Sequence, residues 1–160
     1  MTLEERAEKA REMLFSRYDA LNALWLQAEE QLTQLHVPRP VSYTYAKYQE
    51  EDEPIGAITC KCLGLQKIRG KWRICHSLYE EWRDQHLGWI PITECSAESR
   101  VESAKHLDDL RKAVVESAER FIPKVDEAIS TLAKTVGLPA NAQSRDLLAE
   151  RAKLNGHHNK

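Results

Sequence analysis

Apolar side chains recur at spacings of three and four over residues 2–35, and charged residues fill most positions between them. This period places the apolar residues on one side of a long α-helix of coiled-coil type. Thr2 favours a helix start, because its hydroxyl can cap a free N–H group. Pro38 and Pro40 end the helix, since neither has the N–H group that the next turn needs. The stripe comprises Leu3, Ala7, Ala10, Leu14, Tyr18, Leu21, Trp25, Ala28, Leu32 and Leu35.

A second helical period runs from about Ala97 to Val136. Ser96 is a suitable N-cap, and Gly137 followed by a proline suits the end of a helix. Pro123 lies inside the period and is expected to kink or divide the helix. Its apolar stripe is Val101, Ala104, Leu107, Leu110, Val114, Ala118, Phe121, Val125, Ala128, Leu132 and Val136.

Between the two helical patterns lie segments typical of β-strands. Residues 41–48 alternate and are rich in tyrosine, threonine and valine, so they predict a strand. Residues 55–79 predict two further strands that fold back at Arg69-Gly70, since glycine supplies a positive φ angle at low cost. Residues 80–95 have no clear period and are expected to form an irregular rim.

A two-residue turn at this point would pair Ile68 with Lys71 and Leu65 with Ile74. Leu63, Leu65, Trp72, Ile74 and Leu78 would then form a core face, and Cys60, Cys62, Cys75, Lys71 and Arg73 the opposite face. A three-residue loop would instead exchange the faces of one strand relative to the other. The register therefore decides which side chains lie together.

These patterns predict an α+β fold with two long helices and a small antiparallel sheet. The helices are expected to form an antiparallel, coiled-coil-like hairpin, with a three-stranded sheet inserted between them. Residues 1–136 would form one domain, followed by a polar tail over 137–160 with a short helix at 144–154. Two chains could pair into a four-helix arrangement, so a homodimer is a hypothesis.

Composition and charge limit the kinds of partner and the cellular location that can be expected. The chain has 160 residues, of which 42% are apolar and 30% charged, and its net charge is −2. No apolar run reaches the length of about 18 residues that a membrane helix needs, so no membrane partner is expected. The first residues lack the apolar core of a secretory signal, and four cysteines without export features suggest reduced thiols. These observations predict a cytoplasmic protein.

The predicted hairpin is rich in positive charge. Lys61, Lys67, Arg69, Lys71 and Arg73 occur within thirteen residues that include no acid. Such a ribbon can contact nucleic-acid phosphates, and Trp72 could add a stacking surface. Alternatively, the cations protect an exposed strand from edge-to-edge pairing, or the acidic loop at 50–53 neutralises them.

Two other clusters suggest metal chemistry but fit it poorly. Cys60, Cys62 and Cys75, with His76 or Cys95, lack the C-x₂₋₄-C knuckle of structural zinc sites, and buried cysteines often serve as small apolar residues. Glu98, Glu102 and His106 recur every four residues, which is also typical of a solvated helix face. No metal or other cofactor is therefore predicted.

The sequence favours a non-enzymatic interaction or regulatory protein that acts through a helical stalk and a β-hairpin head. No P-loop, G-x-G-x-x-G, H-E-x-x-H or G-x-S-x-G motif occurs. Its partner would be another protein or a second copy. A nucleic-acid-binding regulator using the hairpin from Lys61 to Arg73 is the first alternative, and a metal-dependent hydrolase is the second. The predicted oligomerisation stripe is Leu14, Tyr18, Leu21, Trp25 and Leu32.

Overall fold

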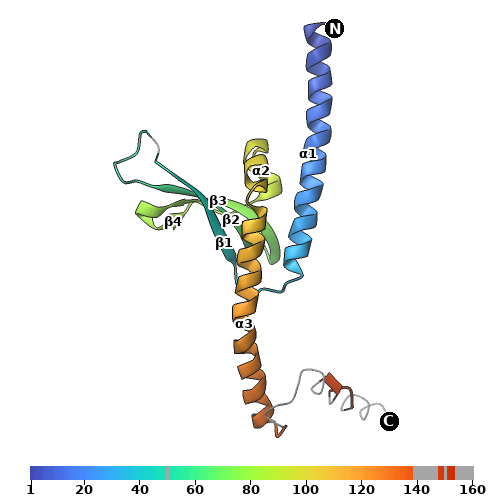
Figure 1. Cartoon of the computed structure of the whole chain (residues 1–160), viewed down its shortest axis with the longest axis vertical. Coiled ribbons are helices and arrows are strands. Elements are labelled where there is room, and N and C mark those ends of the chain that lie inside the picture. Colours follow the sequence, from blue (N-terminus) through green and yellow to red (C-terminus); the bar gives the residue numbers. More distant parts are fainter. Residues whose placement is uncertain (50, 139–147, 150, 154–160) are drawn as a thin grey trace. The chain divides into compact units, whose positions relative to one another are not determined.

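The computed structural model describes residues 1–49, 51–138, 148–149 and 151–153 (Figure 1). The chain divides into two compact units, residues 1–118 and residues 119–160. The first unit combines helices with an antiparallel sheet, which confirms the predicted α+β class. Within the described residues, no helix is both long enough and apolar enough to cross a membrane.

Helix α1 spans Leu3–Thr33 and begins with a capping box. The Thr2 hydroxyl accepts a hydrogen bond from the Glu5 N–H at 3.1 Å, and the Glu5 carboxylate accepts one from the Thr2 N–H at 2.7 Å. Two of the free N–H groups at the helix start are thereby satisfied. The predicted start at Thr2 is confirmed.

The sheet contains three long strands and two short ones. Strands β1 (Val41–Tyr48), β2 (Thr59–Ile68) and β3 (Lys71–Glu80) form an antiparallel meander. Strands β4 (Gln85–His86) and β5 (Ile90–Pro91) both pair with β3. The prediction of three strands therefore missed two, because two-residue strands carry no alternating pattern.

The β2–β3 hairpin has the predicted two-residue turn. Ile68 pairs with Lys71 and Leu65 with Ile74. Arg69 has a φ of 49° and Gly70 a φ of 82°, as a tight hairpin turn of the type I′ class requires. The register prediction is confirmed, and with it the division of side chains between the two faces.

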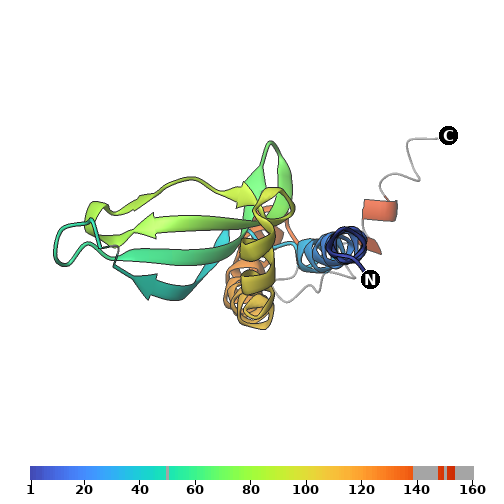
Figure 2. The same cartoon turned by 90° about the horizontal axis from the view of Figure 1, so that it is seen from above.

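The core lies on the face of the sheet that carries Leu63, Leu65 and Ile74, all of which are fully buried. Trp25 and Leu32 from α1 and Leu110 and Val114 from α3 pack against this face. Figure 2 shows α2 and the first part of α3 lying against the sheet. Burial of each large apolar side chain contributes about 1.5–3 kcal/mol, so this cluster holds the unit together.

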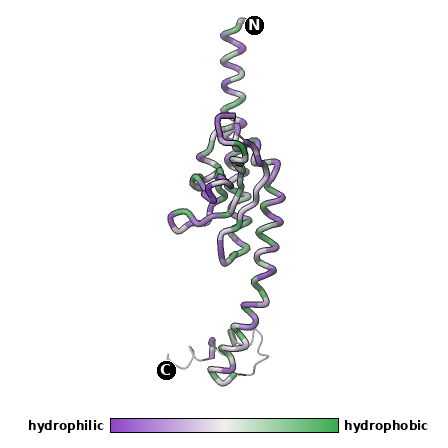
Figure 3. Tube along the Cα trace, turned by 90° about the vertical axis from the view of Figure 1, so that its left-hand side faces the viewer, coloured by the Kyte–Doolittle hydropathy of each residue, from purple (hydrophilic) through white to green (hydrophobic). Residues whose placement is uncertain are grey.

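The predicted antiparallel pairing of the two long helices is not confirmed. The main contacts of α1 are with β3 and with the short 3₁₀ turn η2 (Ile92–Glu94), because Trp25 and Leu32 are used in the sheet core. Residues 1–17 are all exposed. Apolar positions nevertheless recur along α1 up to its first turn (Figure 3).

The second helical pattern forms two helices instead of one. Helix α2 spans Ala97–Ala104 and α3 spans Leu107–Thr135, so the break falls at Lys105–His106. The helix does not divide at Pro123, which lies inside α3. Ser96 caps α2 as predicted, accepting from the Ser99 N–H at 3.1 Å.

Residues 80–95 are more ordered than an irregular rim. They form the 3₁₀ turn η1 (Glu81–Arg83), β4, β5 and η2. Ile92 is buried in the core, whereas Trp82 and Ile90 are 38% and 51% exposed. This segment folds back along the edge of β3, because that edge would otherwise present unpaired N–H and C=O groups.

The second unit contains the end of α3. Gly137, with a φ of 80°, follows the helix, and the Leu138 N–H donates to the Ala133 carbonyl at 2.7 Å. This arrangement is a Schellman motif, in agreement with the predicted helix end. The short helix predicted at 144–154 lies mostly outside the described residues.

Candidate functional site: a cationic cleft at the hairpin tip

Two of the five hairpin cations are bound inside the first unit. The Lys61 Nζ donates to both carboxylate oxygens of Glu102 in α2, at 3.2 and 2.9 Å. The Arg73 Nε donates to the Glu29 Oε1 at 2.9 Å, and its Nη2 donates to the Thr93 Oγ1 at 3.2 Å. These two side chains join the helices to the sheet, so their charges are largely neutralised.

The three other cations, Lys67, Arg69 and Lys71, are exposed at the hairpin tip. Among the residues that the structure describes, none of them has an ion-pair partner. These side chains carry the available positive charge of the hairpin.

The acidic loop lies at the other end of the sheet, since it follows Tyr48, which pairs with Thr59 at the start of β2. Ten residues of β2 separate it from the tip, or about 30 Å at the usual rise of a strand. That is several times the Debye length of about 8 Å at physiological salt, so the loop does not neutralise the tip.

A cleft of about 430 Å³ lies beside the tip, on the face of the sheet opposite the core. Its polar wall combines the turn and the start of β3, and its apolar wall comes from the β4–β5 segment. The lining residues are Ile68, Arg69, Lys71, Arg73, Trp89, Ile90, Pro91 and Glu94. Cationic, aromatic and apolar groups thus face one concave surface.

Trp89 is positioned by Gly64 in the middle of β2. A Cβ atom at Gly64 would lie 2.9 Å from the Trp89 Cζ3 and 2.9 Å from the Val41 carbonyl oxygen. Only glycine therefore lets the indole ring approach the sheet this closely. The His86 ring lies at a centroid distance of 4.9 Å from the indole and supports it further.

The predicted binding residues do not form a single surface. Lys61 and Trp72 lie on the core face, where Trp72 packs against the core. Lys71 and Arg73 lie on the opposite face, beside the cleft. The sequence pointed to Trp72 and not to Trp89. Residues 80–95 have no clear period, so the sequence does not indicate on which face of the sheet the Trp89 side chain lies.

The predicted oligomerisation stripe is divided between the core and the surface. Trp25 and Leu32 are 3% and 4% exposed, and Tyr18 and Leu21 are half-buried. Leu14 is 49% exposed. The part of the stripe that is free for a partner is therefore its N-terminal part.

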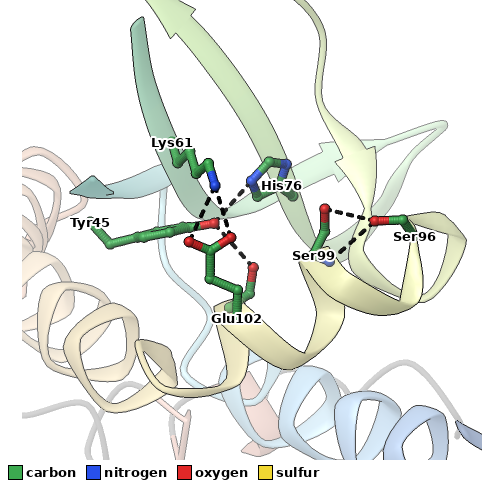
Figure 4. A network of polar contacts seen from close by, with 7 residues as sticks. Tyr45, Lys61, His76, Ser96, Ser99 and Glu102 are labelled. Atoms are coloured by element: carbon green, nitrogen blue, oxygen red, sulfur yellow. Dashed lines mark hydrogen bonds and ion pairs between the residues drawn. The ribbon is translucent and has the colours of Figure 1, made fainter. Parts of the chain in front are cut away.

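A polar network on the core face fastens α2 to the sheet (Figure 4). The Tyr45 hydroxyl lies 3.1 Å from the His76 Nε2 and 3.5 Å from the Ser103 Oγ. His106 stacks on the Tyr45 ring with centroids 4.4 Å apart. Tyr45 is the extra residue of a bulge in β1, and a bulge re-aims a side chain.

Burial and charge shift the ionisation of this network. Burial raises the pKa of Tyr45 and lowers the pKa of His76, and the nearby Lys61 lowers the pKa of His76 further. The hydrogen bonds to Glu102 raise the pKa of Lys61. At neutral pH the network therefore contains a neutral phenol, a neutral imidazole and one internal ion pair. We interpret it as a network that stabilises the fold.

A groove of about 620 Å³ beside the network is a weaker candidate than the cleft. Its lining residues are Tyr18, Lys61, Ala97, Glu98, Val101, Glu102 and Lys105. Lys61 and Glu102 already satisfy each other there. The cleft at the tip, in contrast, is lined by two cations that have no partner in the described part of the chain.

The cysteines do not form a metal centre. Cys60, Cys62 and Cys75 are buried on one face as free thiols, and His76 lies on the other face. Burial raises the pKa of Cys75 to about 12. Over the described ranges, no three His, Cys, Asp or Glu side chains are grouped so as to hold a metal ion.

The carboxylate stripe of α2 is also divided. Glu102 is bound to Lys61, and His106 is stacked on Tyr45, whereas Glu98 is exposed. These side chains therefore do not act together as one set of ligands.

Comparisons with protein-family models, with curated proteins and with solved structures find no match to this chain. Two surfaces stand out in the first unit: the exposed N-terminal half of α1 and the cleft at the hairpin tip.

Proposed function

We propose that this protein is a non-enzymatic interaction protein that associates with a second copy of itself through the N-terminal half of α1. One observation carries the proposal. The apolar stripe that is buried at Trp25 and Leu32 continues without a change of face to Leu14 and Leu3, which are 49% and 73% exposed. Two copies that pair along this stripe would remove it from water.

The length of the free segment supports the proposal. Residues 3–17 are the helical but entirely exposed start of α1, whereas most helices in proteins are stabilised by packing of an apolar face. The capping box and the Glu8–Arg11 ion pair stabilise the segment only weakly. A second helix packed along the stripe would add the larger contribution of apolar burial.

Charge complementarity favours a second copy as the partner. Four acids and three bases alternate along the first three turns: Glu4, Glu5, Glu8 and Glu12 with Arg6, Lys9 and Arg11. Mixed charges at the flanks of a stripe allow two identical helices to pair in a two-fold arrangement. A uniformly charged segment would repel its own copy.

The mass of the protein in solution, measured by light scattering after size-exclusion chromatography over a range of concentrations, tests this proposal. We expect the wild type to move toward a dimer as concentration rises, and Leu14→Glu to remain monomeric because it places a charge on the stripe. Ser16→Glu, on the opposite side of the helix, is the matched control and should dimerise normally. A wild type that stays monomeric up to about 100 µM, well above the dissociation constants of ordinary dimers, would refute the proposal.

Nucleic-acid binding at the hairpin tip is a second candidate function. It is supported by Lys67, Arg69 and Lys71, which are exposed and lie far from the acidic loop. Each phosphate contact makes binding weaker as salt rises. Binding of oligonucleotides that is absent, or that does not change between 50 and 200 mM salt (about a fourfold range, over which such contacts weaken strongly), would exclude this function.

A further inference from the structure

We propose that the cleft at the hairpin tip binds one unpaired nucleotide unit, with its base against Trp89 and its phosphate on Arg69 and Lys71. The inference rests on the second candidate function and names the form of nucleic acid that the site recognises. A nucleotide unit combines a flat ring with a negative charge. The cleft presents a flat ring on its apolar wall and, on its polar wall, two cations that have no ion-pair partner among the described residues.

The cations that line the cleft differ in how much of their charge is available to a ligand. Arg73 is held by Glu29 and Thr93, so it shapes the wall and has little charge left for a ligand. Arg69 and Lys71 are exposed and have no ion-pair partner in the described ranges. A phosphate at the open end of the cleft would contact both, and charge-assisted hydrogen bonds to phosphate are stronger than neutral ones.

The backbone at Arg69 gives independent support. Its φ of 49° lies in the left-handed region, where a type I′ turn strongly prefers asparagine, aspartate or glycine. Arginine is disfavoured there, so its presence is not explained by the turn itself. Residues held in unfavourable conformations are concentrated at functional sites. A contact between the guanidinium group and a ligand would explain the choice.

Trp89 provides a fixed platform. Gly64 allows its ring to rest close to the sheet, and the His86 ring lies beside it. A ring that is held in place loses little freedom when a base stacks on it. Stacking on aromatic side chains is the usual means by which proteins hold unpaired bases.

The size and form of the cleft favour a single unpaired unit. Its volume of about 430 Å³ lies within the range of ordinary ligand pockets, about 300–1,000 Å³. The bases of a duplex are stacked inside the helix and cannot enter such a cleft without being flipped out. Glu94 repels a phosphate on its side of the cleft but can accept hydrogen bonds from base amino groups or sugar hydroxyls. A strand of single-stranded nucleic acid and a free nucleotide share this chemistry.

Fluorescence anisotropy on the full chain tests the inference. The probes are a labelled single-stranded ten-residue oligothymidylate, a labelled duplex, and unlabelled thymidine monophosphate as competitor. The variants are Arg69→Asn, which suits the turn better and so keeps the fold, Lys71→Glu, and Trp89→Leu with Trp89→Phe as the conservative substitution. Lys105→Glu, directly after α2 and outside the cleft, is a control that makes the same charge change as Lys71→Glu.

We expect single-strand binding with a log–log salt slope of about −0.7, the value for one neutralised phosphate on a single strand. Arg69→Asn and Lys71→Glu should weaken it, and Trp89→Leu should weaken it by about 5- to 150-fold, the range for loss of one stacked base. Trp89→Phe and Lys105→Glu should bind as the wild type does. If thymidine monophosphate displaces the labelled oligothymidylate, a free nucleotide is sufficient for binding. If only unlabelled oligothymidylate displaces it, the polymer is the ligand.

Two results overturn the inference in distinguishable ways. If the wild type binds none of the three probes, the nucleic-acid function fails and the inference fails with it. If the wild type binds duplex as well as single strand, and Trp89→Leu binds both as tightly, the hairpin binds nucleic acid without using the cleft. In that case the candidate function stands and the inference is wrong.

Discussion

Glu29 joins α1 to the edge of the sheet with one carboxylate. Its Oε2 accepts from the Ile74 N–H at 2.8 Å, and its Oε1 accepts from the Arg73 Nε at 2.9 Å. The Glu29 side chain is 13% exposed, so both bonds form in a largely dry environment. The carboxylate takes the place of a neighbouring strand at this point of β3.

The structure sets the size of the effect of Glu29→Ala. A hydrogen bond to a charged group contributes about 1.5–3 kcal/mol, and a buried N–H group left without an acceptor costs about 1–3 kcal/mol. The Arg73 side chain is 25% exposed and can be partly hydrated after the substitution, which reduces its share. We expect Glu29→Ala to lower the free energy of unfolding by about 2–4 kcal/mol, a large part of the usual total of 5–15 kcal/mol. Glu29→Gln keeps an acceptor and should cost about 1–2 kcal/mol.

Urea unfolding followed by tryptophan fluorescence measures this difference. All four tryptophans lie in residues 1–118, so the signal reports the first unit alone. With a slope of about 2 kcal/mol per molar urea, Glu29→Ala should lower the midpoint by about 1–2 M. Glu30→Ala, at the exposed next position, is the control and should change stability by less than about 0.5 kcal/mol. Equal midpoints for the two alanine variants would refute the role assigned to Glu29.

Three further outcomes follow from packing and ionisation in the first unit. Gly64→Ala places a Cβ 2.9 Å from Trp89 and from the β1 backbone, so it should cost about 1–3 kcal/mol in the same urea assay, and an unchanged midpoint would contradict this. Cys75 is fully buried and its pKa is raised to about 12, so thiol reagents at pH 8 should modify it only after unfolding, as mass spectrometry of the labelled peptide would check. Burial lowers the pKa of His76, so the unfolded chain binds its proton more readily and stability should fall as pH drops below about 6.5. An NMR titration that gave His76 an ordinary or raised pKa would exclude that mechanism.

Local patterns were sufficient to predict the hairpin. An Arg-Gly turn and the alternation of residues on either side determine which residues pair, and the two faces follow from the pairing alone. The helix starts at Thr2 and Ser96 were predictable for the same reason, because a cap depends on residues within one turn. These features involve few residues that are far apart in the sequence.

The break between α2 and α3 could not be predicted from periodicity. Ala104 and Leu107 continue the apolar stripe at a spacing of three, so the sequence indicates an unbroken helix. The break instead coincides with the stacking of His106 on Tyr45, a contact between residues about sixty positions apart. Tertiary contacts of this kind override local helix propensity.

The candidate site was predictable in its charge but not in its composition. A run of hairpin cations is visible in the sequence, whereas the carboxylates that neutralise Lys61 and Arg73 lie 41 and 44 positions away. Trp89 was not identifiable because its position depends on Gly64, a residue of another strand. Only the fold shows which cations are free and which aromatic ring accompanies them.

The position of a cation along the hairpin determines whether its charge is neutralised by an internal ion pair. Lys61 is bound by the Glu102 carboxylate of α2, and Arg73 by the Glu29 carboxylate of α1. Lys67, Arg69 and Lys71 lie nearer the turn, and none of them has an ion-pair partner in the described part of the chain. Internal ion pairs therefore remove charge from the body of the hairpin and leave it at the tip, beside the cleft. A local patch of this kind can attract an anion even though the whole chain has a net charge of −2.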